Sequence, residues 1–207
     1  MNAQHPFETI AAFYDRRVAE FGHHPRACDY GHPDSQRRKF LALSTALDHE
    51  GRSVLDIGCG FADYADHLAT RYASFQYSGM DLSPAMIARA RAIHPDLDLQ
   101  VGNILDLENP QTPSHDIVSA NGIFYLLGAD ADALMKRIVT AMFRRCREAV
   151  VFNTLSTWAK TQEPGEFYSD PISTVAWCRE LTPWVTLHHD YLLHDFTIVL
   201  RRERKGL

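Results

Sequence analysis

From residue 51 onward, short runs of β-branched and other apolar residues alternate with longer segments in which apolar residues recur at helical spacing. This alternation is typical of βαβ units that build a parallel sheet. The runs predict strands at residues 53–57, 76–80, 97–101, 116–120 and 149–153. Ser83-Pro84 and Asp170-Pro171 each place an N-cap residue before a proline at the first helical position, so a helix is expected after each pair.

Two further segments flank this pattern. Residues 7–21 and 34–48 have helical periodicity and are joined by a loop over 22–33, so they are expected to cap the edge of the sheet. At the other end, residues 184–191 and 195–202 alternate between apolar and polar side chains around a short connection, which predicts an antiparallel hairpin. The expected fold is α/β, with five parallel strands followed by this terminal hairpin and preceded by a helical N-terminal cap.

The composition is that of one globular unit. The chain has 207 residues, 45% of them hydrophobic, and we expect a single domain over 1–207 with the cap in 1–50 and the core in 51–207. The net charge of -5 argues against nucleic-acid binding as the main activity. Four scattered cysteines form no CxxC pair, so neither a metal site nor a disulfide framework is expected. We find no leader-like start and no apolar run of about 18 residues, and we expect a cytoplasmic protein that does not enter the membrane.

The strongest motif lies at residues 54–63, VLDIGCGFAD, where a buried strand ends in a glycine turn and a helix begins. Without side chains at Gly58 and Gly60, the backbone around Cys59 can turn sharply and approach a ligand closely. Taken alone, the two glycines are a weak signal, and a turn that only joins a strand to a helix is the alternative explanation.

Polar residues that follow the next strands extend the candidate site. Asp81 ends the second strand, 21 residues after Gly60, where a carboxylate can accept hydrogen bonds from both hydroxyls of an adenosine ribose. Asn103 follows the third strand and can bond an adenine edge, with Ile104 and Leu82 as apolar walls about the ring. Ligands of open α/β sheets bind outside the carboxyl ends of the strands, which adds two candidates after the fourth strand, Asn121 and Tyr125.

The ordered series DIGCG, GMDLS, VGNIL and DIVSANGIF resembles the motifs of class I S-adenosylmethionine-dependent methyltransferases. The resemblance implies a Rossmann-like methyltransferase sheet, S-adenosylmethionine as the cofactor and methyl transfer as the reaction. It also implies that Asp56 lies near the methionine amino group and that Asp81 is the ribose acid, while Asn103 stands where the family often has Asp. Similar family members close their site with N-terminal helices, so Tyr14 is a candidate to meet the sulfonium and Arg38 is the cationic candidate to pair with the methionine carboxylate. Core packing of Tyr14 and a surface position of Arg38 are the alternatives.

Other functions remain open at this point. A nicotinamide-dependent oxidoreductase would use the same glycines and ribose acid, but Asp63 occupies its third glycine position and the chain has no second domain. A non-catalytic module that only binds the cofactor is another alternative. We expect O-methylation of a small-molecule acceptor, with N-methylation as the alternative. No motif specifies the acceptor or the oligomeric state.

The densest group of titratable residues is in the predicted hairpin, and histidine is well suited to remove a proton near neutral pH. By strand alternation, Val185, Leu187, His189 and Tyr191 share one face, which carries the apolar residues expected to pack inward. This predicts His189 as a general base for a hydroxyl acceptor, with Tyr125 as a second catalytic candidate. A solvated surface hairpin explains the group equally well, and an acidic acceptor arrives ionised and needs no base.

Overall fold

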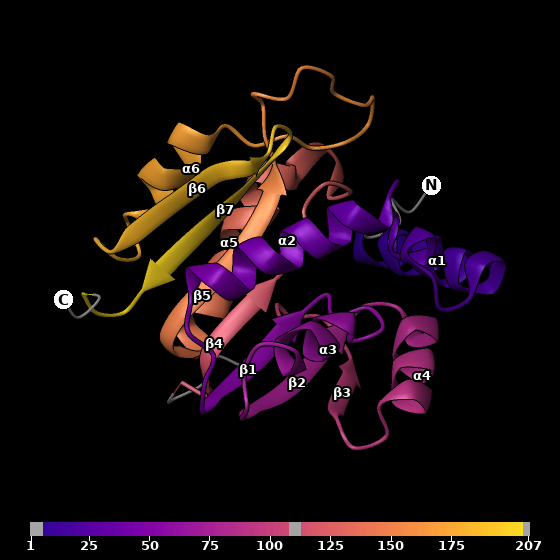
Figure 1. The fold of residues 1–207 in the computed structure, drawn as a ribbon. Helices are drawn as coiled ribbons and strands as arrows, with labels where there is room; N and C mark the ends of the chain where they lie inside the picture. The colour runs from indigo at the N-terminus through magenta and orange to yellow at the C-terminus, as the bar shows by residue number, and fades with distance from the viewer. Residues whose placement is uncertain (1–5, 108–112, 205–207) are drawn as a thin grey trace.

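The structure is a computed structural model that describes residues 6–107 and 113–204. Its strands are β1 (Arg52–Ile57), β2 (Phe75–Asp81), β3 (Asp98–Val101), β4 (His115–Ala120), β5 (Cys146–Leu155), β6 (Val185–Leu192) and β7 (Asp195–Arg201). They form one seven-stranded sheet in the order β3-β2-β1-β4-β5-β7-β6 (Figure 1). Strands β1 to β5 are parallel, whereas β7 is antiparallel to β5 and β6. The predicted parallel sheet with a terminal hairpin is confirmed.

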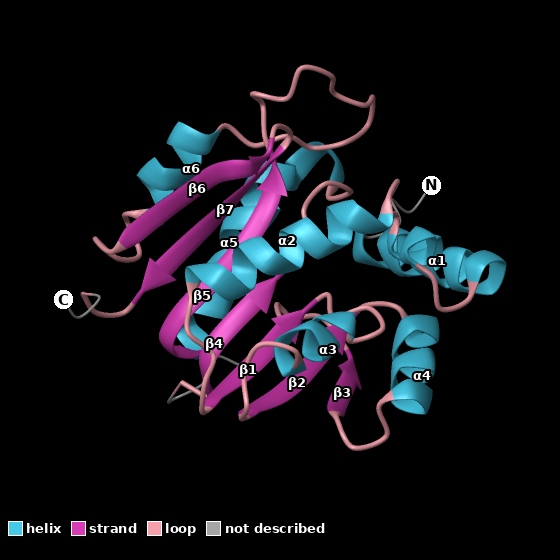
Figure 2. Cartoon of the chain, viewed as in Figure 1, coloured by secondary structure: helices cyan, strands magenta, loops and turns pink. Residues whose placement is uncertain are grey.

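Helices cover both faces of this sheet (Figure 2). They are α1 (Pro6–Phe21), α2 (Pro33–Ala46), α3 (Asp63–Ala69), α4 (Pro84–Ile93), α5 (Ala131–Arg145) and α6 (Pro171–Cys178), with 3-10 turns η1 (Pro25–Cys28) and η2 (Gly128–Asp130). Val151 of β5 packs in one core cluster with Leu43 of α2, whereas its neighbour Val150 packs in another with Met135 of α5. The alternation along β5 therefore supplies both layers. Among the helices of the described segments, none has the length and apolar character needed to cross a bilayer.

The caps predicted for two helices are present. The Ser83 hydroxyl accepts a 3.0 Å hydrogen bond from the Met86 amide at the start of α4. The Asp170 carboxylate accepts a 2.7 Å hydrogen bond from the Ser173 amide at the start of α6. Each side chain satisfies one of the amide groups that the first turn of a helix leaves without an intrahelical partner.

The two N-terminal helices lie over different parts of the sheet edge. Helix α1 packs on α4, where Tyr14 and Val18 contact the small cluster that contains Phe61 and Met86. Helix α2 crosses β5, β7 and β6 (Figure 1). The turn η1 connects them. Tyr14 of α1 and Tyr30 after η1 reach the segment that follows β4, at the carboxyl edge of the sheet. Helix α2 instead packs Leu43 on the face of β5, so only part of the N-terminal segment lies at the edge as a cap.

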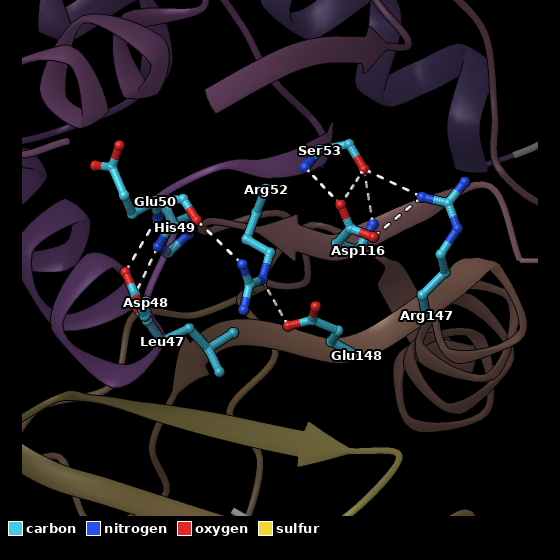
Figure 3. A network of polar contacts seen from close by, with 9 residues as sticks. All are labelled: Leu47, Asp48, His49, Glu50, Arg52, Ser53, Asp116, Arg147 and Glu148. Carbon is cyan, nitrogen blue, oxygen red and sulfur yellow. Dashed lines mark hydrogen bonds and ion pairs between the residues drawn. The ribbon is translucent and has the colours of Figure 1, made fainter. Parts of the chain in front are cut away.

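A polar network occupies the opposite edge, where β1, β4 and β5 begin (Figure 3). The backbone amide and hydroxyl of Ser53 donate to Asp116 at 2.8 and 2.7 Å, and Arg147 pairs with the same carboxylate at 3.0 Å. Arg52 pairs with Glu148 at 2.8 Å. These contacts join three neighbouring strands far from their carboxyl ends, so this charged group stabilises the sheet rather than the site.

Strand β6 departs from simple alternation. Its register with β7 shifts between His188 and Leu192. Before the shift, the predicted inward face is present, since Leu187 packs on the α5 core and the His189 ring contacts Phe196. After the shift, the Tyr191 hydroxyl bonds to Asp195 and Thr197. These two residues flank Phe196 in β7, so their side chains lie on the face of the sheet opposite to Phe196 and His189. The prediction that Tyr191 shares the face of His189 is therefore wrong, because a bulge reverses the orientation of the later residues.

Candidate active site

A cavity of about 640 Å³ lies between the cap and the carboxyl ends of the parallel strands. It extends from Asp81 and Asn103, past Gly58 and Asn121, to Asp195 at the start of β7. Its volume falls within the range of about 300 to 1,000 Å³ that is typical of small-molecule sites. The predicted residues that line it are Tyr14, Asp56, Gly58, Cys59, Gly60, Asp81, Leu82, Asn103, Ile104, Asn121 and Tyr125. Two predicted residues, Arg38 and His189, are not part of its lining.

The glycine turn is held tightly between two strands. Gly58 and Gly60 have φ values of 73° and 54°, in the left-handed region that favours glycine. A Cβ atom at Gly58 would lie 2.3 Å from Cγ2 of Ile123, so the turn approaches the segment after β4 too closely for any side chain. A Cβ at Gly79 in β2 would likewise lie 2.7 Å from Cys59 Sγ. Sequence reasoning missed Gly79, although glycine inside a strand often marks such a close approach.

Asp81 connects this turn to the next helix. One of its carboxylate oxygens accepts a 2.9 Å hydrogen bond from the Gly60 amide, and the other accepts one of 2.8 Å from the Ser83 amide. Burial raises its pKa. Each oxygen can still accept a second hydrogen bond, and the residue lines the cavity. Asp81 is thus able to bind paired hydroxyls of a ligand.

Asp56 provides a second, deeper carboxylate. Its side chain is 2% exposed and accepts 2.7 Å hydrogen bonds from Tyr77 and Ser119. Burial raises its pKa to about 6. Within the described residues it forms no salt bridge, so an ammonium group of a ligand in the cavity would be favoured by its charge.

Two tyrosine hydroxyls join the cap to the segment after β4. Tyr14 of α1 and Tyr125 hydrogen-bond to each other at 2.9 Å, and Tyr125 donates to Asp29 at 2.7 Å. Arg17 pairs with the same carboxylate at 2.7 Å. Burial raises the pKa of both tyrosines, so both hydroxyls remain protonated near neutral pH. They are suited to orient a ligand and not to accept its proton.

The comparisons with known proteins agree with this geometry. A family of methyltransferase domains matches residues 54–144, which contain the glycine turn, Asp81 and the segment after β4. A Mycobacterium tuberculosis protein named as a methyltransferase is 27% identical over 157 residues, covering 72% of this chain and 93% of that protein. The chain belongs to the class I S-adenosylmethionine-dependent methyltransferases. It is an enzyme of that class, and S-adenosylmethionine is its cofactor.

Two further similarities are more limited. The magnesium protoporphyrin IX methyltransferase of Synechocystis, solved with bound S-adenosylmethionine, superimposes with a TM-score of 0.69 at 12% identity, over 98% of this chain and 100% of that one. At this identity the likeness shows the fold alone. A trans-aconitate 2-methyltransferase of Methylobacterium nodulans is 33% identical over 81 residues, which are 39% of this methyltransferase and 31% of that protein. The match to that enzyme thus spans about a third of its length.

Of the two adjacent cations in α2, the structure brings Lys39 rather than Arg38 to the wall of the methyltransferase cavity. Arg38 points outward and pairs with Asp34 at 2.7 Å, with half of its side chain exposed. Lys39 lines the cavity, is 7% exposed and pairs with Asp195 at 2.7 Å. A signal was present in the sequence, because Lys39 lies three and four residues from Gln36 and Leu43 on the inward face of α2. The structure therefore does not support the expected contact between Arg38 and the methionine carboxylate.

His189 also lies away from the cavity. Its ring packs edge-on against Trp158, 5.0 Å between centroids, and contacts Phe196 at 6.1 Å. Its Nε2 atom is buried and has no hydrogen-bond partner within the described residues. The expected position facing the ligand is not found, because the ring packs between Trp158 of the segment after β5 and Phe196 of β7. The hairpin histidine that does line the cavity is His194.

No group of three or more metal-binding side chains gathers anywhere in residues 6–107 and 113–204. The described cysteines are free thiols, and burial raises the pKa of Cys28 and Cys59 beside the glycine turn. These thiols therefore remain protonated and unreactive near neutral pH.

Proposed function

We propose that this methyltransferase transfers the methyl group of S-adenosylmethionine to an oxygen atom of a small-molecule acceptor. The observation that carries the proposal is the extent of the cavity. It begins at the Asp81 and Gly58 edge and continues under the cap to Thr154, Tyr168 and Asp195. A cofactor at the first end leaves the second end for an acceptor, and the cap helices limit what can enter.

The proposed cofactor site uses the first end of the cavity. Asp81 accepts hydrogen bonds from the ribose hydroxyls, and Asn103 bonds the adenine edge between Ile104 and Leu82. The Asn103 side chain also accepts a 3.0 Å hydrogen bond from the Leu105 amide, which fixes its orientation. The nearly complete burial of Ile104 provides a firm apolar wall for the ring.

The methionine half of the cofactor is proposed to lie over the glycine turn. Asp56 attracts its ammonium group, and the turn Gly58-Cys59-Gly60 allows close approach of the backbone. Asn121 lies at the end of β4, next to this turn in the sheet, and Tyr14 faces the same space from the cap. These roles agree with the buried carboxylate and the left-handed glycines, since both favour a zwitterion held against the main chain.

Alignment is proposed to supply most of the rate enhancement. The cofactor provides an activated methyl group on a sulfonium, and its displacement requires an acceptor atom in line with the breaking bond. Tyr14 and Tyr125 form a rigid hydroxyl pair in the cavity wall, which suits them to orient the acceptor. An acceptor that enters as an anion needs no general base in this scheme.

Oxygen is favoured as the acceptor atom by a similarity as well as by chemistry. The relatives from Methylobacterium nodulans and other bacteria are named trans-aconitate 2-methyltransferases, and the nucleophilic atoms of that acid are oxygens. These three matches cover 39%, 43% and 45% of this chain. The similarity therefore supports oxygen as the acceptor atom and leaves the acceptor itself to experiment.

The test is transfer of labelled methyl from S-adenosylmethionine to small metabolites. The protein is incubated with a metabolite extract and methyl-labelled cofactor, and the products are separated and analysed by mass spectrometry. Label on oxygen, as an ester released by mild alkali or as an ether, is the expected result. Label on nitrogen would overturn O-methylation in favour of N-methylation. Cofactor binding without any labelled product would contradict a small-molecule acceptor.

A further inference from the structure

Lys39 is a buried cation in the wall of the cavity. Its side chain projects from α2, and its Nζ atom lies 2.7 Å from Asp195 Oδ2 and 5.9 Å from the centre of the Tyr30 ring. A buried ion pair pays a large desolvation cost and often adds little to stability compared with apolar residues of the same size. Packing alone therefore gives no reason for a lysine at this position.

Asp195 holds this lysine from behind. It is fully buried at the first position of β7, and its Oδ1 atom accepts a hydrogen bond from Tyr191. Tyr191 is itself fixed by a 2.8 Å hydrogen bond with Thr197. The carboxylate is thus part of the rigid hairpin, and the bulge in β6 is what brings Tyr191 to it. The direction of the Lys39 ammonium is set by the sheet.

The ammonium has donors left for a ligand. A lysine carries three N–H donors and no acceptor. Within residues 6–107 and 113–204, Asp195 is the single ion-pair partner of Lys39. Because Lys39 lines the cavity, a ligand oxygen can take up its remaining donors, and a charged oxygen would be bound most strongly.

The position along the sheet assigns this cation to the acceptor. Between the glycine turn after β1 and Asp195 on β7 lie β4 and β5, so the two points are three strand spacings apart. At about 4.8 Å a spacing, that is about 14 Å. Asp81 on β2 is one strand further away on the opposite side. A nucleotide bound at the ends of β1 and β2 therefore leaves Lys39 in the part of the cavity that the acceptor occupies.

We infer that Lys39 binds a carboxylate group of the acceptor and that Asp195 is the positioning residue that orients it. The inference rests on the proposed function and specifies its substrate class as a carboxylic acid that is anionic at neutral pH. Lys39 is then a specificity-determining residue. A neutral acceptor would leave its ammonium donors unpaired in a desolvated wall, which is costly.

A first experiment identifies the charge of the acceptor. A small-metabolite extract is separated on an anion-exchange resin, and each fraction is incubated with the enzyme and methyl-labelled cofactor. Label is expected in the retained fraction, in a product whose mass shows a carboxylic acid or its ester. Label in the neutral fraction, or in a phosphate or phosphonate, would overturn the inference and leave O-methylation intact. Absence of label from both fractions would overturn the inference together with the proposed function.

A second experiment tests the residues with the acceptor fraction so obtained. Lys39→Met should raise the half-saturating acceptor concentration at least about 10-fold, the effect of losing a hydrogen bond between charged groups, with cofactor affinity unchanged. Lys39→Arg should restore part of the lost affinity for the acceptor. Arg37→Met, on the exposed side of α2, is the matched control. Lys39→Met/Asp195→Asn removes both buried charges, so it keeps the loss measurable if the single variant does not fold. Equal acceptor affinity in these variants, or loss of cofactor binding, would overturn the inference.

Discussion

The side-chain amide of Asn121 donates a 2.7 Å hydrogen bond to the hydroxyl of Tyr30, which lies 91 residues earlier in the chain. Asn153 extends the connection, since its amide donates to Asn121 at 2.6 Å and its carbonyl oxygen accepts from the Gly122 amide at 2.7 Å. Hydrogen bonds thus run from the cap loop through the ends of β4 and β5. The cap loop is hydrogen-bonded to the same residues that end the strands at the cavity, so the position of this loop and the shape of the site are coupled.

Asp81→Ala should weaken binding of S-adenosylhomocysteine, the demethylated cofactor, by about 1 to 3 kcal/mol. The reason is that both ribose hydroxyls would lose their acceptor and the Gly60 amide would lose its partner. Isothermal titration calorimetry measures this. Asp98→Ala, at the exposed start of β3, is the control and should bind normally. Unchanged affinity of the Asp81 variant would contradict the assignment, as would tight binding of NAD by the unmodified protein.

Gly79→Ala should destabilise the fold by about 1 to 3 kcal/mol, as expected for overpacking of a tight core. The new methyl group would lie 2.7 Å from Cys59 Sγ and 2.9 Å from Leu99 Cδ2, and both neighbours are buried. Urea denaturation gives the change in unfolding free energy. Gly102→Ala is the matched control, because the nearest atom to its Cβ would be Met80 Sδ at an ordinary 3.5 Å. Equal stability of the two variants would show that the glycine turn can move away from β2.

The order of the elements could be predicted from the sequence because apolar runs and glycine turns are local signals. The motif residues after β1 to β4 follow from the same logic, since parallel strands end at one edge of a sheet. Contacts across the cap could not be predicted in this way. Tyr30 meets Asn121 through packing of distant segments, and no spacing along the chain encodes that contact.

Two side-chain orientations were not predicted from the sequence. Arg38 and Lys39 are adjacent cations, and the helical phase set by Phe40 and Leu43 decides which of them is buried. In β6 the bulge before Leu192 turns Tyr191 toward Asp195, and a register shift leaves no mark in an alternating sequence. The overall fold was thus more predictable than the face on which individual residues lie.

The stability of the protein should depend on the charge of Asp56. Burial raises its pKa from 3.8 to about 6, so the folded chain binds this proton more readily than the unfolded chain. The contribution of Asp56 to stability is then fully present below about pH 4 and is lost as the pH rises through 6. A shift of about two pKa units corresponds to roughly 3 kcal/mol.

Asp56→Asn should abolish that dependence. Its unfolding free energy, measured in urea at several pH values, should improve relative to the unmodified protein by up to about 3 kcal/mol between pH 4 and pH 7. Asp98→Asn, on an exposed strand, should show no such trend. A difference between Asp56→Asn and the unmodified protein that stays constant over this range would contradict the raised pKa.

His189→Phe separates a packing role from a catalytic one. The imidazole lies between Trp158 and Phe196 and its Nε2 atom is buried without a partner among the described residues, so a phenyl ring should fill the same space without an unsatisfied polar atom. We expect unchanged or higher stability by thermal unfolding, and a kcat within a few-fold of the unmodified enzyme. A general base would instead cost about 100-fold to 10,000-fold when removed. A loss of that size, with the protein folded and the cofactor bound, would show that His189 reaches the acceptor in a conformation other than this one and acts as the base predicted from the hairpin pattern.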